Sequence, residues 1–563
     1  MGFEPEELAP DATPVVVVAA AGDGRGNEFA GPWRPLYRHP CAFGPDVFAD
    51  VMANLIKNPN INSSWLFRAD ILHDEPGPSP APAPSPSSPP PGASPPGPGG
   101  LPPLLAFDGF ELRRRVVRRL IPRNTLRDKP LDQTCLIYAG LPPAAGPDPA
   151  PGDARSLVVY LPHVASPDEM PFYHPAVRGI AFLHEWDAAG SRGSISLSYL
   201  FFDPGEPEER GAPAKDDGGG SATTRLARTA LRLLEVVHKH GAGRLAGYQK
   251  RVHHDRLIPQ ARVQDTYMRL KHRYARELIQ GWAEVTDPQK HVFEDLCIAA
   301  FLMELWADMY GVRAGADPDA AAASFPGFVD IGCGNGLLVY ILNQEGFRGW
   351  GFDARSRKSW ANYSTKVRVP GSGNEDEQDS LRELVLVPPP VLEAAAAAAA
   401  QEGAAASLPA HRIHDGRFPK GTFVISNHAD ELTPWTPILA ALSGCPFIAI
   451  PCCSHNLAGA KFRAPAPPRD SSGNHKDKGK KGKADSAYAS LVAWLGDIAR
   501  DCGWEVEHEM LRIPSTRNAA ILGRRQTAEL VDIASVVARY GGAEGYLASA
   551  IKLVASTPRE DEH

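Results

Sequence analysis

The chain has 563 residues and a formal net charge of −7. Its length suits two or three domains, and no stretch has the ~18 uninterrupted apolar residues that a membrane span needs. The charge argues against a globally basic nucleic-acid binder, although it allows local basic patches. Its eight cysteines do not indicate a disulfide framework. The acidic N-terminus lacks the basic start of a signal peptide, so we expect a cytoplasmic protein with reduced thiols.

The first half of the chain is predicted to be an α+β region. Residues 1–32 are expected to be flexible, and the folded region runs from 33 to 285. A helical apolar pattern opens the segment Pro45–Leu72. Stretches rich in Pro, Gly, Ser and Ala predict disordered inserts at about 74–103, 141–153 and 203–223.

An arginine-rich segment, Phe107–Tyr138, follows the first insert. The spacing of its apolar residues predicts a helix with one apolar stripe and arginines around the remaining surface; the stripe comprises Leu112, Val116, Val117 and Leu120. Two interpretations stay open at this point. The arginines form either a solvated basic face or a phosphate-binding face, because guanidinium forks grip phosphate oxygens.

Further elements of this region follow from its hydrophobic periodicity. Strands are expected at Ser156–Leu161, Gly179–Leu183 and Ser194–Phe202, and helices at Thr224–Lys239 and over a long basic stretch that ends near Trp282. The adjacent His253 and His254 suggest a metal site at first. However, neighbouring side chains diverge and no Cys/His cluster lies at ligand spacing, so we expect no metal.

The second half alternates strand and helix patterns, which predicts a parallel α/β sheet over residues 286–525. Residues 287–310 have a strong helical period and are expected to cover this sheet. Inserts are expected at about 371–379 and 463–485, and the alanine run Ala394–Ala400 is interpreted as a tolerated insertion. Expected strands are Gly327–Ile331, Gly349–Phe352, Glu383–Leu386, Thr422–Ser426 and Phe447–Ile450. A helix at 486–502, closing antiparallel strands near 504–511 and 519–522, and a helical tail at 526–563 complete the prediction.

The stretch Phe328–Gly336 joins an apolar strand to a helix through a glycine-rich turn, G-x-G-x-G. Glycines let a backbone approach a ligand closely, and helix N-termini offer free N–H donors. The next strand ends in Asp353, and an acid at that place suits a ribose diol. The turn differs from the dinucleotide fingerprint G-x-G-x-x-G and resembles motif I of S-adenosylmethionine-dependent methyltransferases. Candidate cofactor-binding residues are Asp330, Gly332, Cys333, Gly334, Asn335, Gly336, Asp353 and Asn427.

Two polar clusters follow later strands of the predicted sheet, at the edge where open α/β sheets bind ligands. Asn427, His428, Asp430 and Glu431 lie within five residues after an apolar strand. This cluster is either a reactive site or a helix N-terminus, in which Asn427 caps and the acids suit the dipole. The segment Pro451–His455 holds two cysteines and a histidine. They do not match a structural zinc site, and walls of the substrate pocket are favoured over a nucleophilic cysteine.

Several sequence motifs in the same order resemble the fungal and animal tRNA (uracil-2′-O-)-methyltransferase family, which methylates uridine 44 of serine tRNA. They are RRLIPRNTLRDKPLDQTC, YQKRVHHDRLIPQ, DPQKHVFEDLCIAAFLMELW, FVDIGCGNGLLVYIL, GWGFDARSRKSW, SNHADELTPW, IPCCSH and RIPSTRN. The resemblance runs from about Trp33 to Arg524, interrupted by the expected inserts. It departs after Cys453, which leaves His455 and Lys461 without an assigned role.

This resemblance implies a Rossmann-like methyltransferase domain behind an α+β RNA-binding region, with S-adenosylmethionine as cofactor and serine tRNA as partner. No membrane or metal is implied. Asp430 and His428, with Glu431 third, are the candidates for the group that takes the hydroxyl proton. The expected RNA contacts are Arg114, Arg118, Arg123, Lys250, Arg251 and Lys271. The alternatives are a methyltransferase that acts on another RNA or a protein, and a non-catalytic RNA-binding protein of the same fold.

Overall fold

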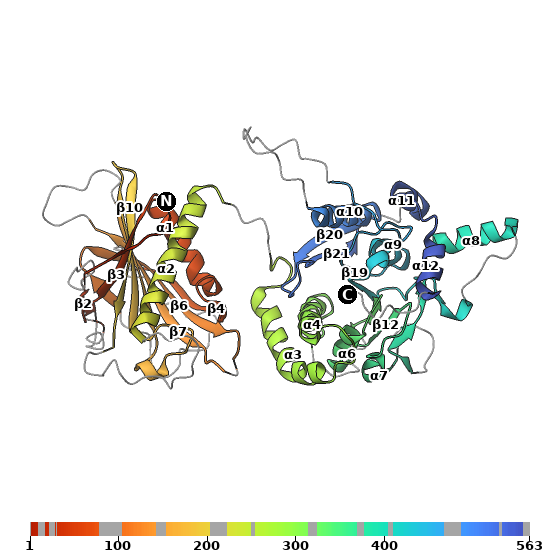
Figure 1. Ribbon diagram of the computed structural model, residues 1–563, viewed down its shortest axis with the longest axis horizontal. Helices are drawn as coiled ribbons and strands as arrows, with labels where there is room; N and C mark the ends of the chain where they lie inside the picture. Colours follow the sequence, from red (N-terminus) through yellow and green to blue (C-terminus); the bar gives the residue numbers. More distant parts are fainter. Residues whose placement is uncertain are drawn as a thin grey trace, which may run out of the picture. The chain divides into compact units, whose positions relative to one another are not determined.

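The computed structural model describes residues 2–9, 17–21, 29, 31–77, 104–125, 127–141, 154–202, 222–248, 254–313, 324–368, 377–402, 409–466, 486–527 and 532–555. Contacts divide the chain into two units, Met1–Lys250 and Arg251–His563 (Figure 1). This division precedes the expected boundary at residue 285, because helix α3 (Gln260–Gln280) packs on α4 (Pro288–Tyr310) within the second unit. For example, Nε of Arg262 donates to Oε2 of Glu304 at 2.9 Å. None of the described helices has the length and apolar character for crossing a membrane.

An antiparallel sheet of eight strands forms the centre of the N-terminal unit. In spatial order they are β1 (Glu6–Glu7), β3 (Arg34–Cys41), β10 (Arg192–Leu200), β9 (Gly179–Asp187), β8 (Ala154–Pro162), β7 (Leu131–Gly140), β6 (Phe110–Pro122) and β4 (Leu66–Pro76). Helices α1 (Pro45–Lys57) and α2 (Ala222–Leu245) pack on one face. On the other face, β2 (Val17–Ala21) pairs antiparallel with β5 (Leu104–Phe107), and Phe107 packs into the core. The predicted α+β character is confirmed, with three expected strands and two helices at their places.

The helix predicted within Phe107–Tyr138 is wrong, because this segment forms strands β5, β6 and β7. Val116 and Val117 are adjacent and both buried, so β6 is covered on both faces and lacks a clean two-residue alternation. β-branched residues favour extended backbone, and β6 has a hydrogen-bonded partner strand on each side. Tertiary pairing therefore overrides the helix-like spacing. The residues of the three expected inserts lie largely outside the described ranges, although β4 extends to Pro76.

The second unit is a doubly wound sheet with seven strands. Their spatial order is β15 (Leu381–Glu383), β12 (Gly349–Asp353), β11 (Phe328–Ile331), β18 (Phe423–Asn427), β19 (Phe447–Ile450), β21 (Ala519–Gln526) and β20 (Trp504–Met510). The first five run parallel, and the last two join antiparallel as predicted. The chain proceeds outward from β11 and then returns to β18 on its other side. The sheet therefore has a topological switch point between β11 and β18, which is where ligands bind in this architecture.

Helices cover both faces of this sheet. α3, α4 and α6 (Leu337–Gln344) pack on one face, and α9 (Thr436–Ser443) and α10 (Ala487–Asp501) on the other. The alanine run belongs to helix α8 (Pro389–Glu402). The expected helical tail contains α11 (Ile533–Arg539) and α12 (Tyr546–Ala555), whose apolar faces join the second core. The remaining short elements are α7 (Trp360–Tyr363), β13 (Lys366–Val367), β14 (Gln378–Asp379), β16 (Val385–Leu386) and β17 (Ile413–His414).

Candidate active site

The glycine turn lies between β11 and α6, at the switch point. Gly332, Gly334 and Gly336 have φ angles of 72°, 51° and 78°, in the region that favours glycine. A Cβ at Gly336 would lie 2.4 Å from Cδ1 of Leu381, so this position has no room for a side chain. A Cβ at Gly334 would meet nothing within 4 Å, which leaves open space beside the backbone of the turn. The tight turn and the adjacent space both suit a ligand that contacts the main chain.

Asp353, at the end of β12, holds this turn from the neighbouring strand. Its Oδ2 accepts a hydrogen bond from the Gly334 amide at 3.1 Å, and its Oδ1 accepts one from the Arg355 amide at 3.3 Å. Two side chains that the sequence analysis missed fix the turn from α7: the indole of Trp360 donates to the Gly334 carbonyl at 2.9 Å, and the Ser359 hydroxyl donates to the Asn335 carbonyl at 2.8 Å. Their separation of more than 20 residues from the turn left no local signal.

Buried carboxyl groups lie behind the turn. Asp330 is 2% exposed, and its Oδ1 has no hydrogen-bond partner among the described residues. Burial, with the charges of Asp295 and Asp353, raises the pKa of Asp330 well above its ordinary value. Burial and the neighbouring Glu294 raise the pKa of Asp295, on α4, to about 8. Asn427 donates from Nδ2 to Asp295 Oδ1 at 3.4 Å, and its own Oδ1 is buried and unpartnered.

Unpartnered buried acceptors are costly, so this cluster is chemically suited to a cationic or hydrogen-bond-donating ligand. S-adenosylmethionine has such a group in its α-ammonium, and its ribose hydroxyls match the carboxylate of Asp353. The residues present therefore fit this cofactor. Asp295 was not predicted, because it belongs to a helix that reaches the site only through packing.

His428 and Asp430 have φ angles of 52° and 44°, which is rare for residues with side chains. His428 Nε2 lies 3.2 Å from Oε1 of Glu294. Burial opposes ionisation of Glu294, but the hydrogen bond and charge of His428 outweigh it and lower the pKa of Glu294. A short 3-10 helix begins at Asp430, with Asp430 and Glu431 in its first turn and Ala429 in place of the expected Asn427 at the N-cap. The two positive φ angles therefore lie where β18 passes into this helix.

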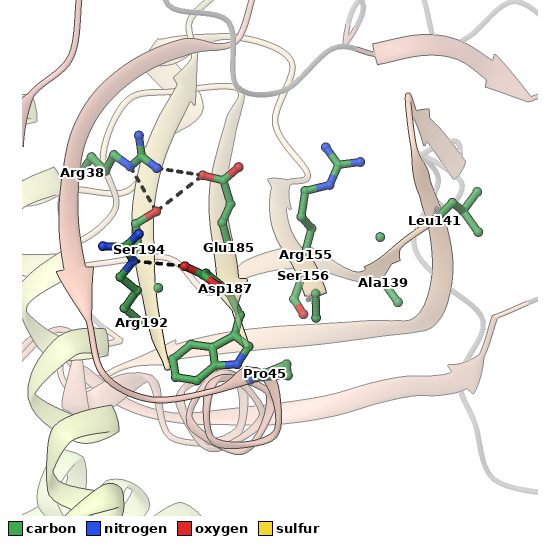
Figure 2. A pocket seen from close by; sticks show the side chains of 14 residues that line it. Arg38, Pro45, Ala139, Leu141, Arg155, Ser156, Glu185, Asp187, Arg192 and Ser194 are labelled. Atoms are coloured by element: carbon green, nitrogen blue, oxygen red, sulfur yellow. Dashed lines mark hydrogen bonds and ion pairs between the residues drawn. The ribbon is translucent and has the colours of Figure 1, made fainter. Parts of the chain in front are cut away.

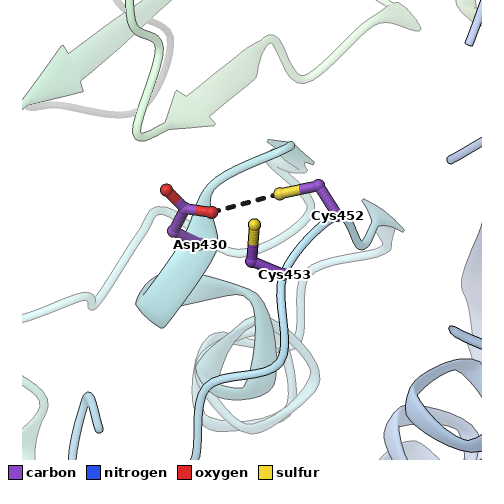
Figure 3. Close-up of side chains that lie close together, drawn as sticks. All are labelled: Asp430, Cys452 and Cys453. Carbon is purple, nitrogen blue, oxygen red and sulfur yellow. Dashed lines mark hydrogen bonds between the residues drawn. The ribbon is translucent and has the colours of Figure 1, made fainter. Parts of the chain in front are cut away.

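Asp430 contacts the two adjacent cysteines of the third predicted cluster (Figure 3). Cys452 Sγ donates to Asp430 Oδ1 at 3.1 Å. Burial first, and then the charge of Asp430, raise the pKa of both the Cys452 and Cys453 thiols, so these groups are poor nucleophiles at neutral pH. One ligand atom from each of the three residues lies within 4.8 Å of the others. The interpretation of Pro451–His455 as a wall of the substrate pocket stays a prediction.

Glu431 and His455 are the other titratable residues of the two polar clusters. Burial raises the pKa of Glu431, and Asp430 and Asp353 add to the effect. His455 is buried, which lowers its pKa, and its backbone pairs with that of the exposed Lys461. The structure therefore brings Asp430, Glu431 and Asp353 into one electrostatic neighbourhood, although they come from two different strand ends.

The residues expected to contact RNA differ in their exposure to solvent. Arg118 is a correction: it is 3% exposed, and its guanidinium donates to the carbonyls of Leu55 and Ile56 and to the Gln133 side chain, so it has no access to phosphate. Arg114 is exposed and forms two hydrogen bonds with Asp74.

The other expected contacts include one further exposed arginine. Arg123 is exposed, with its guanidinium 5.8 Å from the ring centroid of Phe67. Lys271 on α3 has its ammonium 5.0 Å from the ring of Phe293. Lys250 and Arg251 lie outside the described residues. These contacts stay predictions for the exposed members.

A cavity of about 880 Å³ opens in the N-terminal unit along β7 to β10 (Figure 2). Two of its three arginines pair with acids: Arg38 lies 3.1 Å from Glu185, and Arg192 lies 3.1 Å from Asp187. The third, Arg155, donates to the Gly109 carbonyl at 3.4 Å. Most of the positive charge in the cavity is therefore neutralised locally, which makes it a poor site for a polyanion.

The parallel sheet, the glycine turn at its switch point and the acid after β12 define a methyltransferase that uses S-adenosylmethionine. Two family models agree with this class. A model described as "TRM44-like, N-terminal bet v1-like domain" matches residues 9–251, and one described as "Predicted AdoMet-dependent methyltransferase" matches residues 257–372.

The chain belongs to the tRNA (uracil-O(2)-)-methyltransferase family. A relative of that name from Neurospora crassa is 56% identical over 100% of this chain and 99% of the relative. Relatives from Aspergillus oryzae and Schizosaccharomyces pombe carry the same name. The Aspergillus relative is 40% identical over 86% of this chain and 81% of its own length. The Schizosaccharomyces relative is 36% identical over 94% of this chain and 93% of its own length. No solved structure matches the chain significantly.

Proposed function

We propose that this protein is a cytoplasmic enzyme that transfers the methyl group of S-adenosylmethionine to the ribose 2′-hydroxyl of a uridine in tRNA. We further propose position 44 of serine tRNA as the substrate. The proposal depends on two features that lie at one switch point. They are the turn held by Asp353 and the segment Asn427–Glu431, which follows the adjacent strand β18. The names of the relatives support tRNA as the substrate.

The residues of the turn would hold the cofactor. Asp353 would accept hydrogen bonds from the ribose hydroxyls, and the open space at Gly334 admits a ligand against the main chain. The unpartnered oxygens of Asp330 and Asn427 would accept from the ammonium group. When bound, this cofactor supplies a methyl group that its sulfonium has already activated. The chain therefore needs mainly to align the acceptor hydroxyl and to take up its proton.

Asp430 is the proposed proton acceptor. Its carboxylate is partly exposed, and the Cys452 thiol donates to one oxygen, which leaves the other oxygen for a substrate hydroxyl. His428 is less suited, because its Nε2 is occupied by Glu294 and its Nδ1 is buried. Glu431 is the third candidate, and burial raises its pKa. We assign these two residues to orientation and to the electrostatics of the site.

The test is methyl transfer from labelled S-adenosylmethionine to unmodified serine tRNA by the full chain, followed by mapping of the 2′-O-methyl group. We expect one modified uridine, at position 44. Transfer to a different nucleotide would refute the substrate assignment, and transfer to protein alone would refute the class of substrate. Absence of transfer with intact cofactor binding would refute catalysis.

The base assignment is tested by Asp430→Asn, which keeps size and removes the charge. A positioned general base typically contributes about 10²–10⁴-fold, so kcat should fall by roughly 10²-fold with little change in cofactor affinity. Asp497→Asn is the matched control, because Asp497 is a half-exposed acid on α10 that pairs with Arg500. Turnover equal to the unaltered enzyme in Asp430→Asn would remove this residue from the mechanism.

A further inference from the structure

Two highly exposed aromatic side chains lie side by side on the N-terminal unit. Trp65, before β4, is 45% exposed, and Phe172, between β8 and β9, is 48% exposed. Their ring centroids lie 5.5 Å apart in an edge-to-face arrangement. Aromatic rings of this size are normally buried, and a pair that stays in water marks an interaction surface.

Two arginines contact these rings with their guanidinium groups, and a third, Arg123, is joined to Trp65 through its backbone. The Arg127 guanidinium lies 5.6 Å from the Trp65 ring and 5.8 Å from the Phe172 ring. Arg225, near the start of α2, lies 4.2 Å from the Phe172 ring and donates to the Phe172 carbonyl at 2.6 Å. The Arg123 amide donates to the Trp65 carbonyl at 2.8 Å, which joins the ends of β4 and β6. We call Trp65, Phe172, Arg123, Arg127 and Arg225 the arginine–aromatic surface.

The charges of these arginines are not neutralised. In the part of the chain that the structure describes, no carboxylate pairs with Arg123, Arg127 or Arg225. The acids nearby in sequence are engaged or covered: Asp132 pairs with Arg119 at 2.7 Å, and Asp128 is buried. In the cavity on the same unit, by contrast, Arg38 and Arg192 have acidic partners. The arginine–aromatic surface is therefore a local excess of positive charge on a chain whose net charge is −7.

Exposed rings next to unpaired guanidinium groups match the chemistry of unpaired nucleotides. A base stacks on the face of an aromatic ring, and the guanidinium fork binds the neighbouring phosphates. In a double helix the bases are already stacked on one another, so they are not available to stack on Trp65 or Phe172. An acidic peptide would use the arginines but not the two rings as stacking platforms. The loops are also held in place, since the Tyr173 hydroxyl donates to the Lys129 carbonyl at 2.7 Å.

We propose that the arginine–aromatic surface binds unpaired nucleotides of the tRNA substrate, with bases against Trp65 and Phe172 and phosphates at Arg123, Arg127 and Arg225. This inference rests on the proposed function for the identity of the RNA. It replaces the buried Arg118 by loop residues as the RNA contact of this unit, and it retains Arg123 from the predicted set.

The test is equilibrium binding of unmodified serine tRNA to the full chain, without cofactor, for Trp65→Ala, Phe172→Ala and Arg127→Ala. We expect each variant to raise Kd about tenfold, and Arg127→Ala to reduce the slope of log Kd against log salt by about one. Trp65→Phe keeps a stacking ring and should restore most of the affinity. Arg192→Ala, which removes an exposed but paired arginine, and Leu141→Ala, which removes an apolar side chain of similar exposure, are the controls and should bind normally.

The outcome separates this inference from the proposed function. Variants that bind tRNA within twofold of the unaltered chain would overturn it, even if the enzyme methylates uridine, and would leave the surface to a protein partner. Loss of binding in the three variants with normal controls supports it, even if no methyl transfer is found. Affinity for S-adenosylmethionine, measured by calorimetry, should be unchanged in every variant and serves as the check on folding of the second unit.

Discussion

Replacement of Arg118 by alanine should destabilise the N-terminal unit and leave RNA binding by the folded protein unchanged. Nη1 of Arg118 donates to the carbonyls of Leu55 and Ile56, at 3.1 and 2.6 Å, in the last turn of α1. Nε and Nη2 donate to Oε1 of Gln133 at 3.0 and 2.6 Å. The guanidinium also lies 4.8 Å from the centroid of the Tyr160 ring. A single buried side chain therefore ties α1 to β7 and β8.

The expected loss in the free energy of unfolding follows from the acceptor groups that Arg118→Ala leaves without a donor. Three acceptor groups lose their donors, and each unsatisfied buried group costs roughly 1–3 kcal/mol. Water that enters the vacated space restores part of this, so we expect a loss of about 3–5 kcal/mol in the free energy of unfolding. Arg114→Ala is the matched control on the same strand. Its exposed pair with Asp74 should contribute only about 0–1 kcal/mol.

Urea unfolding of the full chain, with hydrogen exchange followed for peptides of α1 and β6, measures both effects. The protection of these peptides should fall in Arg118→Ala and stay near normal in Arg114→Ala. A variant of Arg118 with unchanged unfolding and weakened tRNA binding would refute the reasoning and return this arginine to the RNA surface.

Three further outcomes are expected. Asp353→Ala should weaken S-adenosylmethionine binding by about 1–3 kcal/mol, because a charge-assisted hydrogen bond is lost and the turn loses its acceptor for the Gly334 amide; unchanged affinity in calorimetry would remove Asp353 from the site. The pKa of Asp295 is raised to about 8, so the folded state keeps a proton that the unfolded state releases near its ordinary pKa of 3.8. The contribution of Asp295 to stability without cofactor is therefore lost as pH rises from about 4 to 8, and Asp295→Asn should flatten this dependence in urea unfolding; an unaltered pH profile would contradict the assignment. Dialysis against a strong chelator should leave methyl transfer unchanged, since two adjacent cysteines and one carboxylate do not match the ligand set of a structural zinc site; activity that disappears and returns with added Zn²⁺ would contradict this.

The sequence alone determined the parts of the site that are contiguous in the chain. A strand, a glycine turn, a helix, a second strand and an acid occur in order within residues 328–353, and each step depends on local backbone chemistry. The sequence therefore predicted the strand, the turn, the helix and the acid at the end of the next strand. It did not predict the hydrogen bond from the Gly334 amide to Asp353. Strand ends in a parallel sheet meet at one edge, and this is why the clusters near Asp430 and Cys452 were expected together and lie in contact.

Tertiary structure decided what depends on partners distant in sequence. Helical spacing in β6 was misleading because two neighbouring strands and two covered faces fix its conformation, and the same burial removed Arg118 from the surface. Glu294 and Asp295 reach the site only because α4 packs across the sheet, and no spacing in the sequence links them to His428 and Asn427. The order of the residues sets where charged residues and glycines occur along the chain. Only packing decides which of those charges are buried, which are paired and which remain free to meet a substrate.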